Sequence, residues 1–120
     1  MKFSGDDGLI EAAASIVGLQ YRGSINGHHF AWDPIIENSI NWNPLVDVRD
    51  ALDVLKHSGI SIKQSYHDGR LIMEFTHEAT GVNIKAIPDS LYHGYNGAFC
   101  RGVVIAAVQV VERGSVQSPS

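Results

Sequence analysis

The spacing of the apolar residues changes at Gly59, and this change constrains the fold more than any other feature of the sequence. Before it, the segment 40–58 carries apolar residues three and four positions apart, as on one face of an α-helix. After it, short runs between residues 60 and 87 alternate apolar and polar side chains, which is typical of half-buried strands. The Asp68-Gly69 step between the first two runs predicts a tight hairpin. The chain therefore combines helices with an antiparallel meander.

The amino-terminal part of the chain shows the same two kinds of pattern. Helical spacing of apolar residues predicts a first helix over 7–17, with Asp6 or Asp7 as its cap. Short strands are expected near 20–25 and 28–32, on either side of an asparagine-glycine turn. These strands are available to extend the meander by a fourth strand.

The segment "WNPLVDVRDALDVLKHSG" predicts how the middle helix starts and which face it buries. Asn43 can cap this helix, and Pro44 suits its first position, where no amide hydrogen is needed. Helical spacing predicts an apolar face made of Leu45, Val48, Leu52 and Leu55. The other face carries Asp47, Asp50 and Asp53. No oxygen-rich loop adjoins these aspartates, so a solvated helix surface is favoured over a metal site.

The last helix is expected over residues 98–112, which are apolar almost all round. So narrow a polar stripe predicts cover on more than one side, and a second subunit is the expected cover, which makes the protein a homo-oligomer. The predicted fold is α+β, a three-layer α/β/α sandwich around a mainly antiparallel sheet of three to four strands. A chain of 120 residues supports one domain, 1–112, followed by a disordered tail, 113–120.

Composition excludes several classes of function. The net charge is -4 and the nine Lys and Arg residues are scattered singly, so the basic footprint of nucleic-acid binding is missing. A single cysteine excludes a disulfide framework or a Cys-rich zinc site and fits a reducing compartment. The start lacks a signal-peptide core, and the longest apolar run is too short to cross a bilayer. We therefore expect a cytoplasmic protein without nucleic-acid or membrane partners, metal or cofactor.

Three segments, "LIEAAASIVGL", "WNPLVDVRDALDVLKHSGI" and "AFCRGVVIAAVQVVE", resemble a family of small phage and prophage proteins described as an ABA sandwich. The middle motif of that family looks like W-N-P-L-x-D, two further residues and D-A-L. The matching positions are Trp42, Asn43, Pro44, Leu45, Asp47, Asp50, Ala51, Leu52, Gly59 and Ile60. Val48 and Arg49 depart from it, since an acidic residue and a glycine are expected there. The resemblance implies a phage accessory protein in a bacterial host, and it implies no reaction.

Arg101 is the residue that most indicates a binding site. It lies near the amino end of the last helix, beside a loop predicted over 88–97. Backbone amides at this helix end and the guanidinium predict an anion pocket. The loop side chains expected around it are Tyr92, His93, Tyr95 and Asn96. The alternative is a salt bridge from Arg101 to an acidic residue such as Asp50, and the sequence favours neither.

Aromatic and histidine side chains give weaker signals. Trp32 and Trp42 can stack on a planar ligand, although packing against the helix start as a hydrophobic staple is favoured for Trp42. His28 and His29 would point to opposite faces of a strand, so at most one can enter a site. Cys100 near a helix start and a cation would have a lowered thiol pKa, but a buried structural cysteine is favoured.

Three functions follow from these patterns. The first is a non-enzymatic phage or prophage protein that sequesters a small anionic, nucleotide-like signalling ligand of its host. The second is an inhibitor that binds a host protein through the acidic face of the middle helix. The third is a small hydrolase using His93 or His28 with a carboxylate, which ranks last because no triad, phosphate loop or metal motif accompanies it, and no catalytic residue is assigned.

Overall fold

The computed structural model describes residues 5–88 and 94–117. Within these ranges the chain forms helices and strands in the order α1 (Gly5–Ile16), β1 (Gln20–Ile25), β2 (His28–Asp33), β3 (Asn38–Asn41), α2 (Val48–Ser58), β4 (Ser61–His67), β5 (Arg70–His77), β6 (Val82–Ala86) and α3 (Gly94–Gln117). α1 begins before Asp6 and Asp7, so these aspartates lie in its first turn instead of capping it. The positive end of the helix dipole stabilises both carboxylates there.

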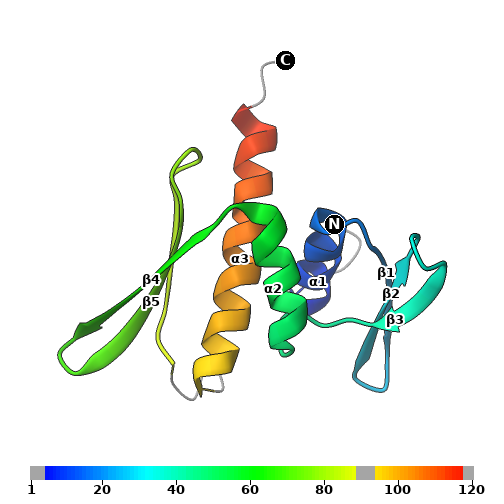
Figure 1. Ribbon diagram of the computed structural model, residues 1–120, viewed down its shortest axis with the longest axis horizontal. Helices are drawn as coiled ribbons and strands as arrows, with labels where there is room; N and C mark the ends of the chain where they lie inside the picture. Colours follow the sequence, from blue (N-terminus) through cyan, green and yellow to red (C-terminus); the bar gives the residue numbers. More distant parts are fainter. Residues whose placement is uncertain (1–4, 89–93, 118–120) are drawn as a thin grey trace.

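The strands divide into two antiparallel sheets, β1-β2-β3 and β4-β5-β6. The helices lie between the sheets, with α3 running through the centre of the molecule (Figure 1). The α+β class and the layering of helices with antiparallel sheet are therefore confirmed. The first two strands do not join the later meander as a fourth strand, because the unforeseen β3 pairs with β2 and α2 then separates the two sheets.

Both predicted hairpin turns are confirmed. Asn26 and Gly27 have φ angles of 52° and 80°, and Asp68 and Gly69 have φ angles of 52° and 76°. Two successive residues with positive φ match the right-handed twist of the paired strands, and asparagine, aspartate and glycine tolerate this conformation best. These turns fix the register of β1 with β2 and of β4 with β5.

The start of α2 differs from the prediction. α2 begins at Val48, and its cap is Asp47, whose side chain accepts hydrogen bonds from the amides of Arg49 and Asp50. Asn43 instead organises a separate turn over Pro44, because its side-chain oxygen accepts from the amide of Leu45 at 3.0 Å. Of the two residues suited to cap α2, Asn43 and Asp47, the later one forms the cap. Gly59 ends the helix in the left-handed conformation, with φ 71°.

This later start also changes which face of α2 is buried. Ala51 and Val54 are buried, whereas Leu52 is exposed and Leu55 is only partly buried. Leu45 is buried, as expected, but it belongs to the turn before the helix. The predicted apolar face was wrong because it combined Leu45, in the turn before α2, with residues of the helix itself, and these two segments have different orientations.

α3 is the central helix of the core. It packs on β5 and β6 on one side and on α1 and α2 on another. Its fully buried residues include Ala98, Cys100, Val103, Val104, Ala106 and Ala107. Elements of the same chain therefore cover much of its apolar surface, and homo-oligomerisation stays a prediction. The helix also continues to Gln117, into the segment 113–120 that was expected to be disordered.

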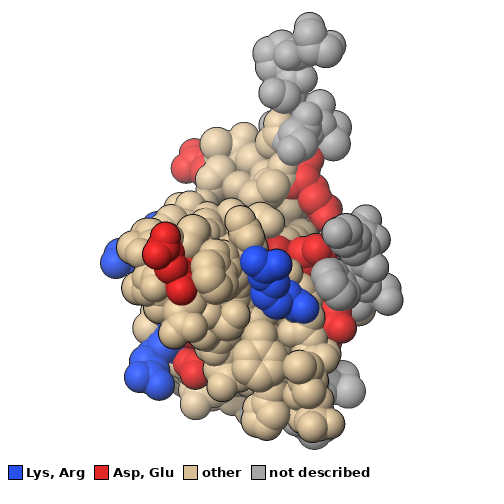
Figure 2. Space-filling view, turned by 90° about the vertical axis from the view of Figure 1, so that its right-hand side faces the viewer, with Lys and Arg blue, Asp and Glu red and all other residues tan. Residues whose placement is uncertain are grey.

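By length and composition alone, α3 meets the criteria for a membrane-spanning helix between Gly94 and Gly114. The central helix of a globular core meets the same criteria, and α3 packs against helices and strands of its own chain. The compact arrangement in Figure 1 agrees with the second description. On the side of the molecule that carries β1–β3, the basic side chains stand apart from one another instead of forming a patch (Figure 2).

Candidate functional site

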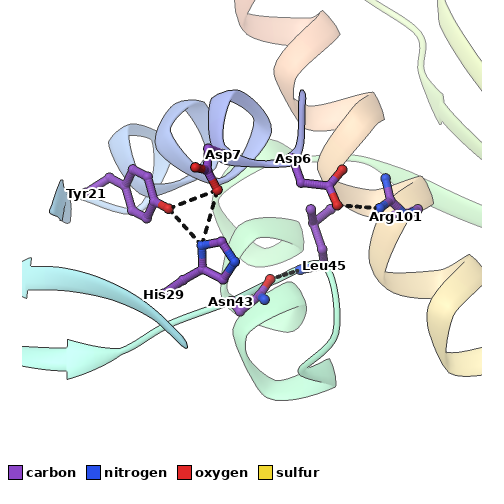
Figure 3. A network of polar contacts seen from close by, with 7 residues as sticks. All are labelled: Asp6, Asp7, Tyr21, His29, Asn43, Leu45 and Arg101. Carbon is purple, nitrogen blue, oxygen red and sulfur yellow. Dashed lines mark hydrogen bonds and ion pairs between the residues drawn. The ribbon is translucent and has the colours of Figure 1, made fainter. Parts of the chain in front are cut away.

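Arg101 forms an ion pair with Asp6, which brings the starts of α1 and α3 together. The Arg101 Nη2 to Asp6 Oδ2 distance is 2.8 Å (Figure 3). The predicted salt bridge exists, but its partner is Asp6 and not Asp50. The Asp6 side chain is 55% exposed and that of Arg101 is 29% exposed. An ion pair this accessible to water contributes about 0–1 kcal/mol, so a ligand can compete for it at small cost.

A cavity of about 310 Å³ opens beside this ion pair. Its polar lining comes from Asp6, His29, Asn43, Asn96 and Arg101, and its apolar lining includes Ile10 and Leu45. We call this cavity the Arg101 cleft. A mainly apolar surface with a few convergent polar groups is typical of small-molecule sites, and the volume is at the lower end of their range.

His29 enters the Arg101 cleft from β2 and is held from behind by α1 and β1. Its Nδ1 lies 2.7 Å from the hydroxyl of Tyr21 and 3.5 Å from Oδ1 of Asp7 (Figure 3). The Tyr21 hydroxyl donates to the same Asp7 oxygen at 3.3 Å. Burial, followed by the charge of Asp7 and the hydrogen bond to it, raises the pKa of Tyr21 to about 12. The phenol therefore keeps its hydrogen at neutral pH.

The turn before α2 forms the opposite wall of the cleft. The amide of Asn43 donates to Oδ2 of Asp50 at 2.9 Å, which ties the turn to the first turn of the helix. Burial raises the pKa of Asp50, while the hydrogen bond from Asn43 opposes this rise and the charge of Asp47 adds to it. A second cavity of about 200 Å³ adjoins here and shares His29, Asn43 and Val46 with the Arg101 cleft.

The family-like motif is thus concentrated at this wall, and its polar residues act on the backbone. Asn43, Asp47 and Asp50 each accept hydrogen bonds from main-chain amides. The two departures from the motif lie in the first turn of α2, where neither Val48 nor Arg49 lines a wall of the cleft. The Arg49 side chain is 92% exposed.

Among the side chains predicted around Arg101, the structure brings only Asn96 to the cleft within the described residues. Tyr92 and His93 lie outside the described residues. Tyr95 is exposed in the first turn of α3, and its hydroxyl accepts a hydrogen bond from the side chain of Gln64 on β4. The predicted 88–97 loop is therefore helical from Gly94 onward.

The two tryptophans occupy different environments. Trp42 is buried in the core and borders the second cavity, in agreement with a packing role. Trp32 lies on β2, where the guanidinium of Arg22 sits 5.8 Å from its ring centroid. Trp32 therefore makes a cation–π contact with Arg22 of the same sheet, and it does not line the Arg101 cleft.

Cys100 is a buried core residue. Burial, with smaller contributions from Asp47 and Asp50, raises the pKa of its thiol to about 11. The buried structural cysteine that the sequence favoured is therefore confirmed, and the alternative of a lowered thiol pKa is not, since α3 starts at Gly94, well before this residue. In the described part of the chain, no three His, Cys, Asp or Glu residues gather in a way that could hold a metal ion.

Sequence reasoning did not assign Asp6, Asp7, Tyr21 and His29 to the site. The strand pattern predicted that at most one of the two adjacent histidines could enter a site. Only the half-buried His29 lines the Arg101 cleft, although the exposed His28 borders the second cavity together with it. The predicted turn at Asn26-Gly27 pairs the strands that carry Tyr21 and His29. The position of α1 against this hairpin is a tertiary contact, and no local sequence signal encodes it.

Comparisons of the chain with protein-family models, with characterised proteins and with solved structures give no match. The resemblance to phage ABA-sandwich proteins therefore stays a prediction from the quoted segments. The chemistry of the Arg101 cleft depends on the geometry of its own residues.

Proposed function

We propose that this protein binds a small anionic, nucleotide-like ligand in the Arg101 cleft and acts by sequestering it. The observation that supports the proposal is the guanidinium of Arg101 at the wall of a cavity of ligand size. Arginine offers five N–H donors in a planar fork, and the bond to Asp6 uses Nη2. A phosphate can engage the fork through two parallel hydrogen bonds, an arrangement that arginine favours.

Uncharged donors in the cleft add to this cation. Asn43 lines the cleft, and because its side-chain oxygen accepts from the amide of Leu45, its side-chain nitrogen is the group that can donate to a ligand. Asn96 and Gly97 lie in the first turn of α3, where backbone amides lack helical acceptors and the helix dipole favours negative charge. These donors can stabilise a bound anion despite the negative charge of Asp6 nearby.

The biological setting comes from the resemblance to phage proteins. A small phage or prophage protein in the cytoplasm of its bacterial host would remove a signalling ligand by holding it, without a reaction. The alternative of an acidic decoy face on α2 has less support, because Asp47 and Asp50 bind backbone amides at the helix start. The hydrolase alternative has no described contact between His28 and a carboxylate.

The test is ligand-dependent thermal stabilisation by the four ribonucleoside 5′-monophosphates, followed by calorimetric titration of those that bind. Arg101→Ala should weaken binding about 10- to 100-fold, which corresponds to the loss of charge-assisted hydrogen bonds worth about 1.5–3 kcal/mol. Arg49→Ala removes an equal charge from an exposed site near the cleft and should leave binding nearly unchanged. Asp6→Asn keeps an acceptor oxygen at this position but removes the negative charge that competes for Arg101, so it should strengthen binding.

Binding that is equally strong in wild type and Arg101→Ala would sink the site assignment. The variant should remain folded, because the ion pair it loses is exposed and contributes about 0–1 kcal/mol. Unfolding temperatures of the ligand-free variants check this directly.

A further inference from the structure

The imidazole of His29 presents its two nitrogens to different surroundings. Nδ1 faces Tyr21 and Asp7, whereas the opposite edge of the ring points toward the space between Asn43 and Asp6 (Figure 3). The side chain is 14% exposed and lines both the Arg101 cleft and the cavity next to it. Its hydrogen bonds to described residues are made through Nδ1.

The carboxylate of Asp7 beside Nδ1 favours a hydrogen on that nitrogen of His29. An ionised carboxylate only accepts hydrogen bonds, so the Asp7 oxygen needs donors from its neighbours. The Tyr21 hydroxyl donates to Asp7 at 3.3 Å, and in that arrangement its oxygen accepts from Nδ1 at 2.7 Å. A bare lone pair on Nδ1 would face the Asp7 carboxylate at 3.5 Å, which is repulsive even where the Tyr21 hydroxyl turned its hydrogen toward Nδ1. A hydrogen on Nδ1 makes both contacts attractive.

A neutral imidazole carries one N–H, so Nε2 of His29 is left as an acceptor on the cleft side. Asp6 supplies a second acceptor in the same cleft, beside the cation of Arg101. A buried acceptor that stays unsatisfied in a complex costs free energy. A ligand that fits the cleft therefore needs hydrogen-bond donors next to its anionic group.

We infer that the anion bound in the Arg101 cleft carries hydroxyl groups, as the ribose phosphate of a ribonucleotide does, and that one hydroxyl donates to Nε2 of His29. The inference rests on the proposed function and adds the chemical class of the ligand. The phosphate binds Arg101, and a second hydroxyl can donate to Asp6, whose carboxylate is partly exposed. Carboxylates commonly bind ribose hydroxyls in this way.

The experiment compares each ribonucleoside 5′-monophosphate with its 2′,3′-dideoxy counterpart by calorimetric titration of the wild-type protein. The paired ligands share the base and the phosphate charge and differ only in the ribose hydroxyls. We expect the dideoxy ligand to bind at least about tenfold more weakly, because it leaves a buried acceptor unpaired. Equal affinity of the two ligands, with binding still weakened in Arg101→Ala, would overturn this inference and leave the proposed function standing. Absence of binding by every member of both sets would overturn the proposed function as well.

Variants of His29 and Tyr21 connect the discrimination to this network. His29→Phe keeps a ring but removes both nitrogens, and it should bind the two ligands equally. His29→Gln can place an acceptor near the position of Nε2 and should retain part of the preference. Tyr21→Phe removes the oxygen that accepts a hydrogen bond from Nδ1. The affinities of this variant for the ribonucleotide and for its dideoxy counterpart should therefore be more similar than those of wild type. A purely structural role of Tyr21 would weaken both ligands by the same factor, and that result would contradict its positioning role.

Discussion

Replacing Gly102 with alanine should destabilise the fold, because α3 passes β5 at this residue without room for a side chain. A Cβ atom added to Gly102 would lie 2.7 Å from Cδ2 of Phe75 and closer still to Cε2 and Cζ of that ring. Phe75 is fully buried, and its ring lies 6.5 Å from that of Phe99, centroid to centroid. Movement of the Phe75 ring would therefore displace other core side chains.

Two effects of opposite sign set the magnitude. Alanine is better than glycine in a helix interior by about 1 kcal/mol. Overpacking a filled core costs about 1–3 kcal/mol, and overlap with several atoms of a ring places this site at the upper end. The net loss in the free energy of unfolding is therefore expected to be about 1–2 kcal/mol.

Urea unfolding at equilibrium measures this loss as a lower midpoint with an unchanged m value. Gly114→Ala is the matched control on the same helix, because a Cβ there meets no atom within 4 Å. It should be neutral or stabilise the protein by up to about 1 kcal/mol. The double variant Gly102→Ala with Phe75→Leu should lose less free energy of unfolding than the two single variants lose together, because the smaller side chain makes room for the added Cβ. A Gly102→Ala protein as stable as wild type would refute the close approach of α3 to β5.

Two other predictions concern titratable groups whose pKa is raised by burial, the partly buried Asp50 and the buried Cys100. Burial raises the pKa of Asp50, so its carboxyl favours folding when protonated, and this contribution is lost as the pH rises through the raised value. Asp50→Asn keeps an acceptor for the Asn43 amide, so its urea midpoint at pH 7 should equal or exceed that of wild type, and this advantage should be gone below pH 3.8. Asp50→Ala loses the acceptor, so its free energy of unfolding should fall by about 1 kcal/mol. A destabilised Asp50→Asn variant at pH 7 would contradict this prediction. Burial also raises the pKa of Cys100 to about 11, so iodoacetamide at pH 8 should label it far more slowly in the folded than in the urea-unfolded protein, and similar rates would show that the thiol is accessible.

The parts of the fold that depend on local chemistry were predictable from the sequence. The two turns with positive φ and the end of α2 at Gly59 follow from residues that are adjacent in the chain. The start of α2 was predicted at the wrong residue, because Asn43 and Asp47 are both good caps and only the packing of the intervening turn decides between them. β3 was missed because its four polar-rich residues gain strand structure only by pairing with β2.

The candidate site was predictable only in part. Arg101 and Asn96 were recognised because a cation and an amide near a helix start indicate an anion site. Asp6 and His29 are far from Arg101 in sequence and reach it through the packing of α1 and β2, which follows from the whole core. The tautomer of His29 depends on two partners from different elements, so no single segment could reveal it.

Occupancy of the Arg101 cleft in protein purified from bacterial cells is the most direct measurement. Native mass spectrometry, compared with the denatured mass, should show added mass in the range of a nucleotide that is lost on denaturation. The added mass should persist in Arg49→Ala and disappear in Arg101→Ala, and the same spectra give the number of subunits. Wild-type protein that carries no added mass, or an Arg101→Ala variant that retains it, would contradict ligand sequestration at this cleft.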